Sequence, residues 1–160
     1  MPRPGFTKIE LMQQLGQAFR VSQNRSVQID ELVAQRLKVN LTDLRALDIV
    51  ERLGRPTAGV LAAEMGLTTG AITAVVDRLV IAGLLERVRD DEDRRRVHLT
   101  LTPRARTEID AVWGPLKEAY VAMMRGYTNE ELALIIRFMR AGDVLSDELI
   151  DRLRTEDGVG

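Results

Sequence analysis

Residues 57–73 read Thr-Ala-Gly-Val-Leu-Ala-Ala-Glu-Met-Gly-Leu-Thr-Thr-Gly-Ala-Ile-Thr, and this stretch decides the fold. Thr57 is a residue type that caps helices, so it is expected to start a short helix. Gly66 fits a tight turn, where a positive φ costs glycine little. Thr68 or Thr69 can then cap the next helix. The pattern predicts two helices joined by a turn, a helix-turn-helix.

The second of these helices has two unlike faces. On a helical wheel its apolar face carries Ile72, Val75, Val76, Leu79 and Val80. The opposite side is small near its N-terminal end and consists of Gly70, Ala74, Asp77 and Ile81, flanked by Thr73 and Arg78. A helix fits the major groove of DNA, and a small outer face lets it approach base edges. An ordinary surface helix, the alternative, would normally carry more Lys and Glu.

A β-hairpin is expected after Gly83, because apolar residues then alternate with polar ones in residues 84–89 and 97–101. The loop between these runs reads Asp-Asp-Glu-Asp-Arg-Arg-Arg (90–96). Adjacent guanidinium groups repel one another, and phosphates or a narrow minor groove would satisfy Arg94, Arg95 and Arg96. In that interpretation Asp93 holds Arg95 or Arg87 by a bidentate bond and orients it. The alternative is a solvated loop whose acids merely neutralise its arginines.

Helical segments flank this region on both sides. A capping box at Thr7–Glu10 opens either one long kinked helix or two shorter ones. Thr42 is expected to cap the next helix, which Gly54 ends. Thr102–Pro103 starts a helix after the hairpin.

A second capping box, Thr128–Glu131, opens the final helix, which Gly142 is expected to break. The apolar stripes of the terminal segments exceed what a domain of ~60 residues can cover by itself, so we expect a homodimer. The residues expected at its interface are Ile9, Met12, Phe19, Leu132, Ile135, Ile136, Met139, Leu145 and Leu149.

Composition excludes several classes of function. The 160 residues carry a net charge of −1, no cysteine and one histidine, so thiol chemistry and cysteine- or histidine-rich metal sites are excluded. No motif for a nucleophile, cofactor or metal is present, and neither an enzyme nor a cofactor is expected. No apolar run approaches ~20 residues and no secretory signal is evident, so we expect a cytoplasmic protein.

Basic charge is concentrated locally, with eight arginines and no lysine between Arg78 and Arg106. The hydroxyls of Thr57, Thr68, Thr69 and Thr73 can donate to phosphates or base edges, with helix capping as the alternative role. His98 is expected to be an exposed strand residue, with contact with DNA or sensing of pH as the alternative role. Trp113 and Tyr120 either pack in a core or interface or line a ligand pocket.

The region 41–106 resembles the multiple-antibiotic-resistance regulator (MarR) family. The matching motifs are Leu41-Thr-x-Leu44, Leu61-Ala, Gly66-Leu-Thr68, Ile72-Thr73, Asp77-Arg-Leu79, Ala82-Gly-Leu84, Arg87, Asp93-Arg-Arg95 and Leu101-Thr102. The resemblance implies a winged-helix homodimer on a pseudo-palindromic operator, with the third helix of this region in the major groove. It also implies small effectors, often aromatic anions, that bind between the dimer helices and the DNA-binding lobe.

Carried over by position, the resemblance implies a role for each matching residue. Those facing bases would be Thr68, Thr69, Ala71, Thr73 and Ala74. Arg78 would contact phosphate, Arg95 the minor groove, and Asp93 would orient the wing. Ala74 departs from the larger polar residue that relatives often carry, so base recognition would then depend on Thr69 and Thr73, or on DNA shape. The cysteine of oxidant-sensing members is absent.

The sequence therefore predicts a mainly α protein with a small β-hairpin wing, a winged helix-turn-helix between dimerisation helices. Its expected parts are 1–40 and 103–154 for dimerisation, 41–102 for DNA binding and 155–160 as a frayed tail. The expected function is a ligand-responsive repressor of transcription. The alternatives are a winged-helix module that binds protein and a small helical enzyme.

Overall fold

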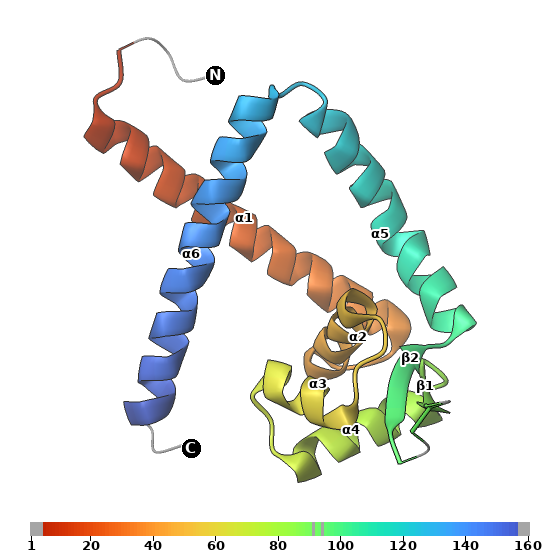
Figure 1. The fold of residues 1–160 in the computed structure, drawn as a ribbon. Helices are drawn as coiled ribbons and strands as arrows, with labels where there is room; N and C mark the ends of the chain where they lie inside the picture. Colours follow the sequence, from red (N-terminus) through yellow and green to blue (C-terminus); the bar gives the residue numbers. More distant parts are fainter. Residues whose placement is uncertain (1–4, 91, 94, 157–160) are drawn as a thin grey trace. The chain divides into compact units, whose positions relative to one another are not determined.

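The computed structural model describes residues 5–90, 92, 93 and 95–156. Over these residues the chain is mainly helical with one two-stranded antiparallel sheet, which confirms the predicted fold class (Figure 1). The elements are α1 Lys8–Leu37, α2 Leu41–Leu53, α3 Ala58–Met65, α4 Thr69–Ile81, β1 Leu85–Arg89, β2 Val97–Leu101, α5 Pro103–Met124 and α6 Asn129–Glu156. The chain forms two compact units, Met1–Val112 and Trp113–Gly160, so α5 crosses the boundary between them.

The helix-turn-helix consists of α3 and α4, and its local signals act as predicted. The Thr57 hydroxyl oxygen accepts a hydrogen bond from the Val60 amide at 3.4 Å. Gly66 ends α3 in the left-handed region with φ 65°. The Thr68 hydroxyl oxygen then accepts from the Ala71 amide at 3.3 Å, which makes Thr68 the N-cap of α4.

The start of α2 differs from the prediction. Asn40 caps this helix, since its side-chain oxygen accepts a hydrogen bond from the Asp43 amide at 2.8 Å. Thr42, the expected cap, instead lies in the first turn. Asparagine and threonine are both good caps, and the choice falls on the residue that stays extended before the turn. Gly54 follows α2 with φ 80°, as expected of a glycine that ends a helix.

One apolar core holds together a lobe formed by α2, α3, α4, β1 and β2 with the last turns of α1. The buried face of α4 contacts α2, α3 and β1, and β2 contacts α2 and α3. The largest fully buried side chains are Val33, Leu47, Val50, Leu61, Ile72, Val76, Leu79, Leu84, Leu85, Leu99 and Leu101. Burial of aliphatic area of this kind is the main stabilising term for a small lobe.

The hairpin is held to the helices by its backbone. Its strands pair from Leu85 with Leu101 to Arg89 with Val97. The Leu99 amide donates to the Pro56 carbonyl at 2.8 Å, so the segment before α3 lies along β2. This backbone contact fixes where the hairpin emerges relative to α3.

The N-terminal segment is one helix, which settles the alternative between one helix and two. Thr7 and Glu10 form the predicted capping box, and α1 continues without a break to Leu37. Lys38 then ends it in the left-handed region with φ 57°. Buried residues of α1 occur only in its last turns and are Val33, Ala34 and Leu37.

The C-terminal helices begin as predicted but are longer. Thr102 precedes α5, and its hydroxyl oxygen accepts from the Ala105 amide at 3.1 Å. Thr128 and Glu131 form the second capping box. The expected break at Gly142 is wrong, because α6 continues through it. A single glycine costs a helix only ~1 kcal/mol, which the rest of the helix can offset.

Within the described residues, no single helix is long and apolar enough to cross a membrane; α3 and α4 reach that threshold only together, as a pair bent by 111°.

Candidate nucleic-acid interface

The outer face of α4 is exposed and made of small residues. Ile72, Val75, Val76 and Leu79 are buried on the opposite face. The exposed residues up to Ala74 are Thr69, Gly70, Ala71, Thr73 and Ala74, none larger than threonine. A Cβ added at Gly70 would meet no atom within 4 Å, so the space outside the helix is open there. The surface can therefore approach a partner closely.

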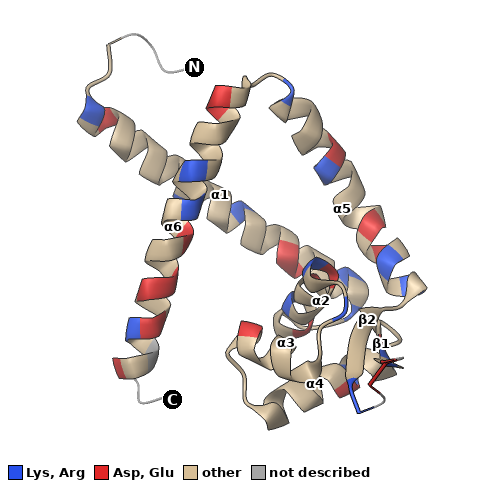
Figure 2. Ribbon diagram, viewed as in Figure 1, with Lys and Arg blue, Asp and Glu red and all other residues tan. Residues whose placement is uncertain are grey.

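Charged residues of α4 lie only in its C-terminal half, as the colouring in Figure 2 also shows. They are Asp77 and Arg78, and each pairs with a residue of another element. Asp77 accepts from the Arg87 guanidinium of β1, with Oδ1 and Nη2 2.5 Å apart. This ion pair connects the helix to the hairpin on the exposed side.

Arg78 is engaged with a buried carboxylate. Its Nη2 and Nε lie 2.6 and 3.2 Å from the two carboxylate oxygens of Asp43 in α2. The Asp43 side chain is 5% exposed and that of Arg78 49%. The hydrogen bond to Asp43 raises the pKa of Arg78 above its ordinary value. The guanidinium group of Arg78, which was expected to contact phosphate, is therefore directed towards Asp43 inside the lobe. The rest of the side chain reaches solvent.

Sequence reasoning missed Asp43. It is the buried charged residue of the described core. A signal was present, because Asp43, Leu47 and Val50 share one face of α2 at helical spacing. An acid on the buried face of a helix needs a cation from another element.

Asp90 stabilises the turn of the wing, the loop between β1 and β2. One carboxylate oxygen of Asp90 accepts from the backbone amides of Glu92 at 2.8 Å and Asp93 at 3.0 Å. Mainly these backbone hydrogen bonds, and a further one from His98, lower the pKa of Asp90 to about 2. The carboxylate therefore stabilises the folded turn above its unfolded pKa of ~3.9, and this contribution is lost as pH falls towards 2.

Asp93 acts on the wing in a different way from the one expected. Its side chain accepts from the Arg95 backbone amide at 3.0 Å, and it lies 3.6 Å from Nε of Arg96. The predicted bidentate bond from Asp93 to Arg95 or Arg87 does not form; Arg87 reaches Asp77 instead because β1 runs beside α4. Asp93 thus shapes the backbone that carries the arginines.

Two arginines of the wing, Arg95 and Arg96, face solvent. Arg95 is exposed, and the Arg96 side chain is 69% exposed. Figure 2 shows acidic and basic residues side by side at the tip of the hairpin. Arg94, also expected to contact DNA, lies outside the described residues.

The threonines divide into capping and free roles. Thr57 and Thr68 use their hydroxyl oxygens as caps. The Thr73 hydroxyl donates to the Thr69 carbonyl at 2.8 Å, so its hydrogen is already used within α4. Thr69 is exposed at the first turn of the helix. Among these hydroxyls, those of Thr57 and Thr68 keep their hydrogens available while serving as caps.

His98 is not the exposed strand residue that was expected. Its side chain is 17% exposed and its two ring nitrogens lie 2.7 Å from the Arg55 carbonyl and 2.8 Å from an Asp90 carboxylate oxygen. The sequence shows only that position 98 alternates with apolar neighbours. The approach of Arg55 and Asp90 follows from tertiary folding.

The residues expected at a dimer interface are largely exposed in the single chain. Ile9, Met12, Phe19, Ile135, Ile136, Met139, Leu145 and Leu149 are all more than two-fifths exposed, and Leu132 is half-buried. These exposed apolar side chains of α1 and α6 leave a surface that a partner could cover, and the dimer interface stays a prediction.

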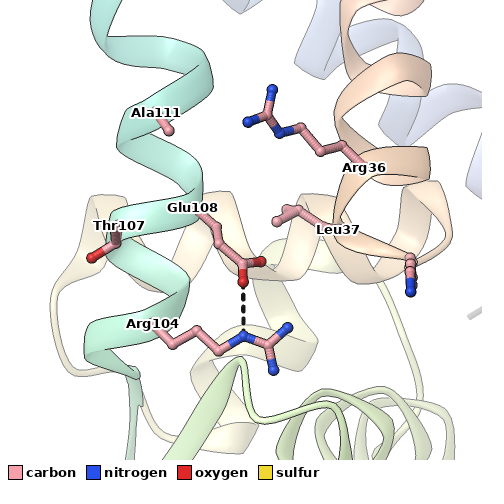
Figure 3. Close-up of a pocket in the computed structure, with 7 residues that line it drawn as sticks. Arg36, Leu37, Arg104, Thr107, Glu108 and Ala111 are labelled. Atoms are coloured by element: carbon pink, nitrogen blue, oxygen red, sulfur yellow. Dashed lines mark hydrogen bonds and ion pairs between the residues drawn. The ribbon is translucent and has the colours of Figure 1, made fainter.

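A pocket of about 370 Å³ lies beside the C-terminal end of α1 and the first turns of α5 (Figure 3). It is lined by Arg36, Leu37, Lys38, Arg104, Thr107, Glu108 and Ala111. Arg104 pairs with Glu108 at 2.7 Å. The two residues suggested from sequence, Trp113 and Tyr120, do not line it; Trp113 is half-buried and Tyr120 is exposed.

Known proteins of similar sequence share this lobe. A family model described as MarR family matches residues 37–96. The HTH-type transcriptional regulator YcgE of Bacillus subtilis (strain 168) is 39% identical over 149 residues, which cover 92% of this chain and 96% of YcgE.

Solved structures of similar fold include two with DNA. FabT of Streptococcus pneumoniae in complex with DNA has a TM-score of 0.65 and 25% identity, covering 86% of this chain and 99% of FabT. A mutant MepR of S. aureus bound to an oligodeoxyribonucleotide has a TM-score of 0.55 and 17% identity, covering 83% of this chain and 96% of MepR.

Fold and relatives together define a winged helix-turn-helix protein. The chain belongs to the MarR family of transcriptional regulators, which confirms the resemblance found in the sequence. The names of its relatives indicate control of transcription.

The Asp43–Arg78 pair predicts how Arg78 influences DNA binding. We expect Arg78→Ala to weaken DNA binding about tenfold through the position of α4, and to have little further effect in an Asp43→Ala background. Arg78→Lys should resemble Arg78→Ala, because lysine keeps the charge but not the bidentate fork. Affinities measured as a function of salt concentration check this. A direct phosphate contact would instead lower the salt slope by ~0.9 in either background.

Proposed function

We propose that the chain is a homodimeric repressor that binds a pseudo-palindromic operator and is released by a small anionic effector. The observation that carries the DNA-binding part is the exposed small face of α4 beside the exposed wing arginines, both in one lobe. In this proposal α4 enters the major groove, where Thr68, Thr69, Ala71, Thr73 and Ala74 approach the bases. Arg95 enters the neighbouring minor groove, whose negative potential attracts arginine.

The first turn of α4 and the caps add phosphate contacts. A helix N-terminus presents free amides and a positive dipole end, which attract phosphate. Thr57 and Thr68 can donate their hydroxyl hydrogens to phosphate while their oxygens cap α3 and α4. Arg78 and Asp77 hold α4 in place through Asp43 and Arg87. Thr57 and Thr68 thus touch DNA, whereas Asp77 and Arg78 position the helix.

Ala74 gives the sharpest test of the approach of α4. Ala74→Glu places a larger, negative side chain on the exposed face, and we expect it to weaken operator binding by about a hundredfold, since single lost recognition steps cost ~1–3 kcal/mol. Ala74→Ser is the matched control and should bind within a few-fold of the parent. Binding is measured on fragments selected from the source genome. If Ala74→Glu binds as the parent does, the alternative of a protein-binding module is favoured.

Dimerisation is supported by the unburied apolar rows of α1 and α6. Met139 is 59% exposed and Leu145 66% in the single chain. Two copies of α4 related by a two-fold axis would reach half-sites about one helical turn of DNA apart. Residues 1–40 and 103–154 are the proposed dimerisation parts, and 41–102 the DNA-binding part.

A charge placed on the apolar row should separate the protomers. We expect Met139→Glu to shift the chain from dimer to monomer at micromolar concentration, because a carboxylate would have to be buried without a partner. Arg137→Glu, which adds the same carboxylate on the other side of α6, is the control and should stay dimeric. Sedimentation velocity measures both. A parent chain that is monomeric while bound singly to its operator would contradict the proposal.

Effector binding is proposed at the pocket beside α1 and α5. Arg36, Lys38 and Arg104 contribute three cations against the single carboxylate of Glu108. The apolar parts of Leu37 and Ala111 suit the hydrocarbon part of an aromatic anion. A ligand there can change DNA binding only if it favours one arrangement of the chain over another.

Benzoate is a suitable probe for this pocket, with neutral benzamide as its control. At constant ionic strength we expect benzoate to weaken operator binding several-fold more than benzamide does, because only benzoate can pair with the cations. Arg36→Gln should reduce that difference. Equal effects of the two compounds, or a difference that Arg36→Gln leaves unchanged, would exclude this pocket as an anion site.

A further inference from the structure

His98 joins two parts of the DNA-binding lobe that are distant in sequence. Its Nδ1 lies 2.7 Å from the carbonyl oxygen of Arg55, in the turn between α2 and α3. Its Nε2 lies 2.8 Å from Oδ2 of Asp90, where the wing leaves β1. The side chain is only 17% exposed, so water competes little for either contact.

Both partners of the ring are acceptors. The Arg55 carbonyl carries no proton, and the Asp90 carboxylate is ionised because two backbone amides lower its pKa to about 2. A neutral imidazole has one N–H and one lone pair, so it can donate to one of these oxygens only. The other contact would then set two lone pairs against each other. Both contacts are hydrogen bonds only if each ring nitrogen carries a proton, as in an imidazolium.

We propose that His98, as an imidazolium, is the positioning residue of the wing. It ties the base of the wing to the α2–α3 turn and fixes the carboxylate of Asp90. The other oxygen of Asp90 holds the amides of Glu92 and Asp93, and Asp93 holds the amide of Arg95. A chain of hydrogen bonds thus runs from Arg55 to Arg95, which is proposed to enter the minor groove. This inference rests on the proposed DNA-binding function.

The charged groups around His98 leave Asp90 as its counter-ion. On β1, which pairs with β2, Arg87 is bound to Asp77 and Glu86 accepts from Thr100. Arg89 lies opposite Val97 at the end of the hairpin. Glu92 and Asp93 follow Asp90 in the wing, and Arg55 faces the ring through its carbonyl. On the side of α3 the strand meets Thr57, which does not titrate in this range.

The bridge from the Arg55 carbonyl through His98 to Asp90 should make DNA binding depend on pH. It exists only while His98 is protonated and Asp90 is ionised. As pH rises and the ring loses a proton, one of the two hydrogen bonds is lost and the wing is held less firmly. Operator affinity is then expected to fall as pH rises and an imidazolium ring gives up its proton.

Nuclear magnetic resonance of the imidazole tests the protonation state in the free protein. The chain has one histidine, so the ring nitrogen signals need no assignment. We expect both nitrogens of His98 to be protonated at neutral pH in the parent. In Asp90→Asn the carboxylate that demands the second proton is gone, and we expect a neutral ring with one N–H. A neutral ring in the parent at neutral pH overturns the inference.

Operator affinity measured as a function of pH tests the role of the bridge. We expect the parent to lose about three- to tenfold in affinity as pH rises, the factor that one hydrogen bond typically contributes. His98→Gln and Asp90→Asn should start weaker and show little pH dependence. A role of His98 in stability alone would lower the melting temperature of both variants without flattening their pH profiles, and this result overturns the inference.

The two experiments separate the inference from the proposed function. A doubly protonated ring in a parent chain that selects no DNA sequence would contradict the proposed function and leave the bridge standing. Sequence-specific binding with the same pH profile in the parent and in His98→Gln would contradict the inference and leave the function standing. If His98→Gln fails to fold, the parent spectrum and Asp90→Asn still decide.

Discussion

The burial of one face of α4 is the constraint on which the rest of the lobe depends. Ile72, Val75, Val76 and Leu79 pack against α2, α3 and β1, so the opposite face must project outwards. Hydrophobic burial is not directional, and by itself it does not define the rotation of a helix tightly. Two ion pairs define the rotation of α4 more tightly, one between Arg78 and buried Asp43 and one between Asp77 and Arg87.

Carboxylates beside the proposed DNA-binding surface need not oppose its function. The net charge of −1 and the acidic run in the wing argue against nucleic-acid binding when charges are simply counted. In the structure Asp90 and Asp93 accept backbone amides, so their charges stabilise a turn. Arg95 and Arg96 remain exposed at the surface. The position of each charge, rather than the sum, decides what the surface can bind.

Local features of the fold were predictable from sequence because they arise within a few residues. The caps at Thr57, Thr68 and Thr102 depend on a side chain reaching an amide three positions along. The two errors have local causes as well. Asn40 is a second capping residue two positions before Thr42, and it is the one that caps α2. The single glycine at position 142 does not stop α6. The DNA-facing residues were suggested by helical periodicity and by family resemblance, and their contacts with DNA stay predictions.

The sequence by itself determined which segments form helices or strands, though not every boundary, and that the outer side of one helix is small. Periodicity and capping are properties of adjacent residues, so no other part of the chain is needed to predict them. Only the tertiary structure decided which charged groups meet. Arg78 and Asp43 are 35 positions apart, and His98 and Arg55 are 43 apart. Such pairs form when the packed core brings distant segments within hydrogen-bonding distance, and no local pattern specifies that approach.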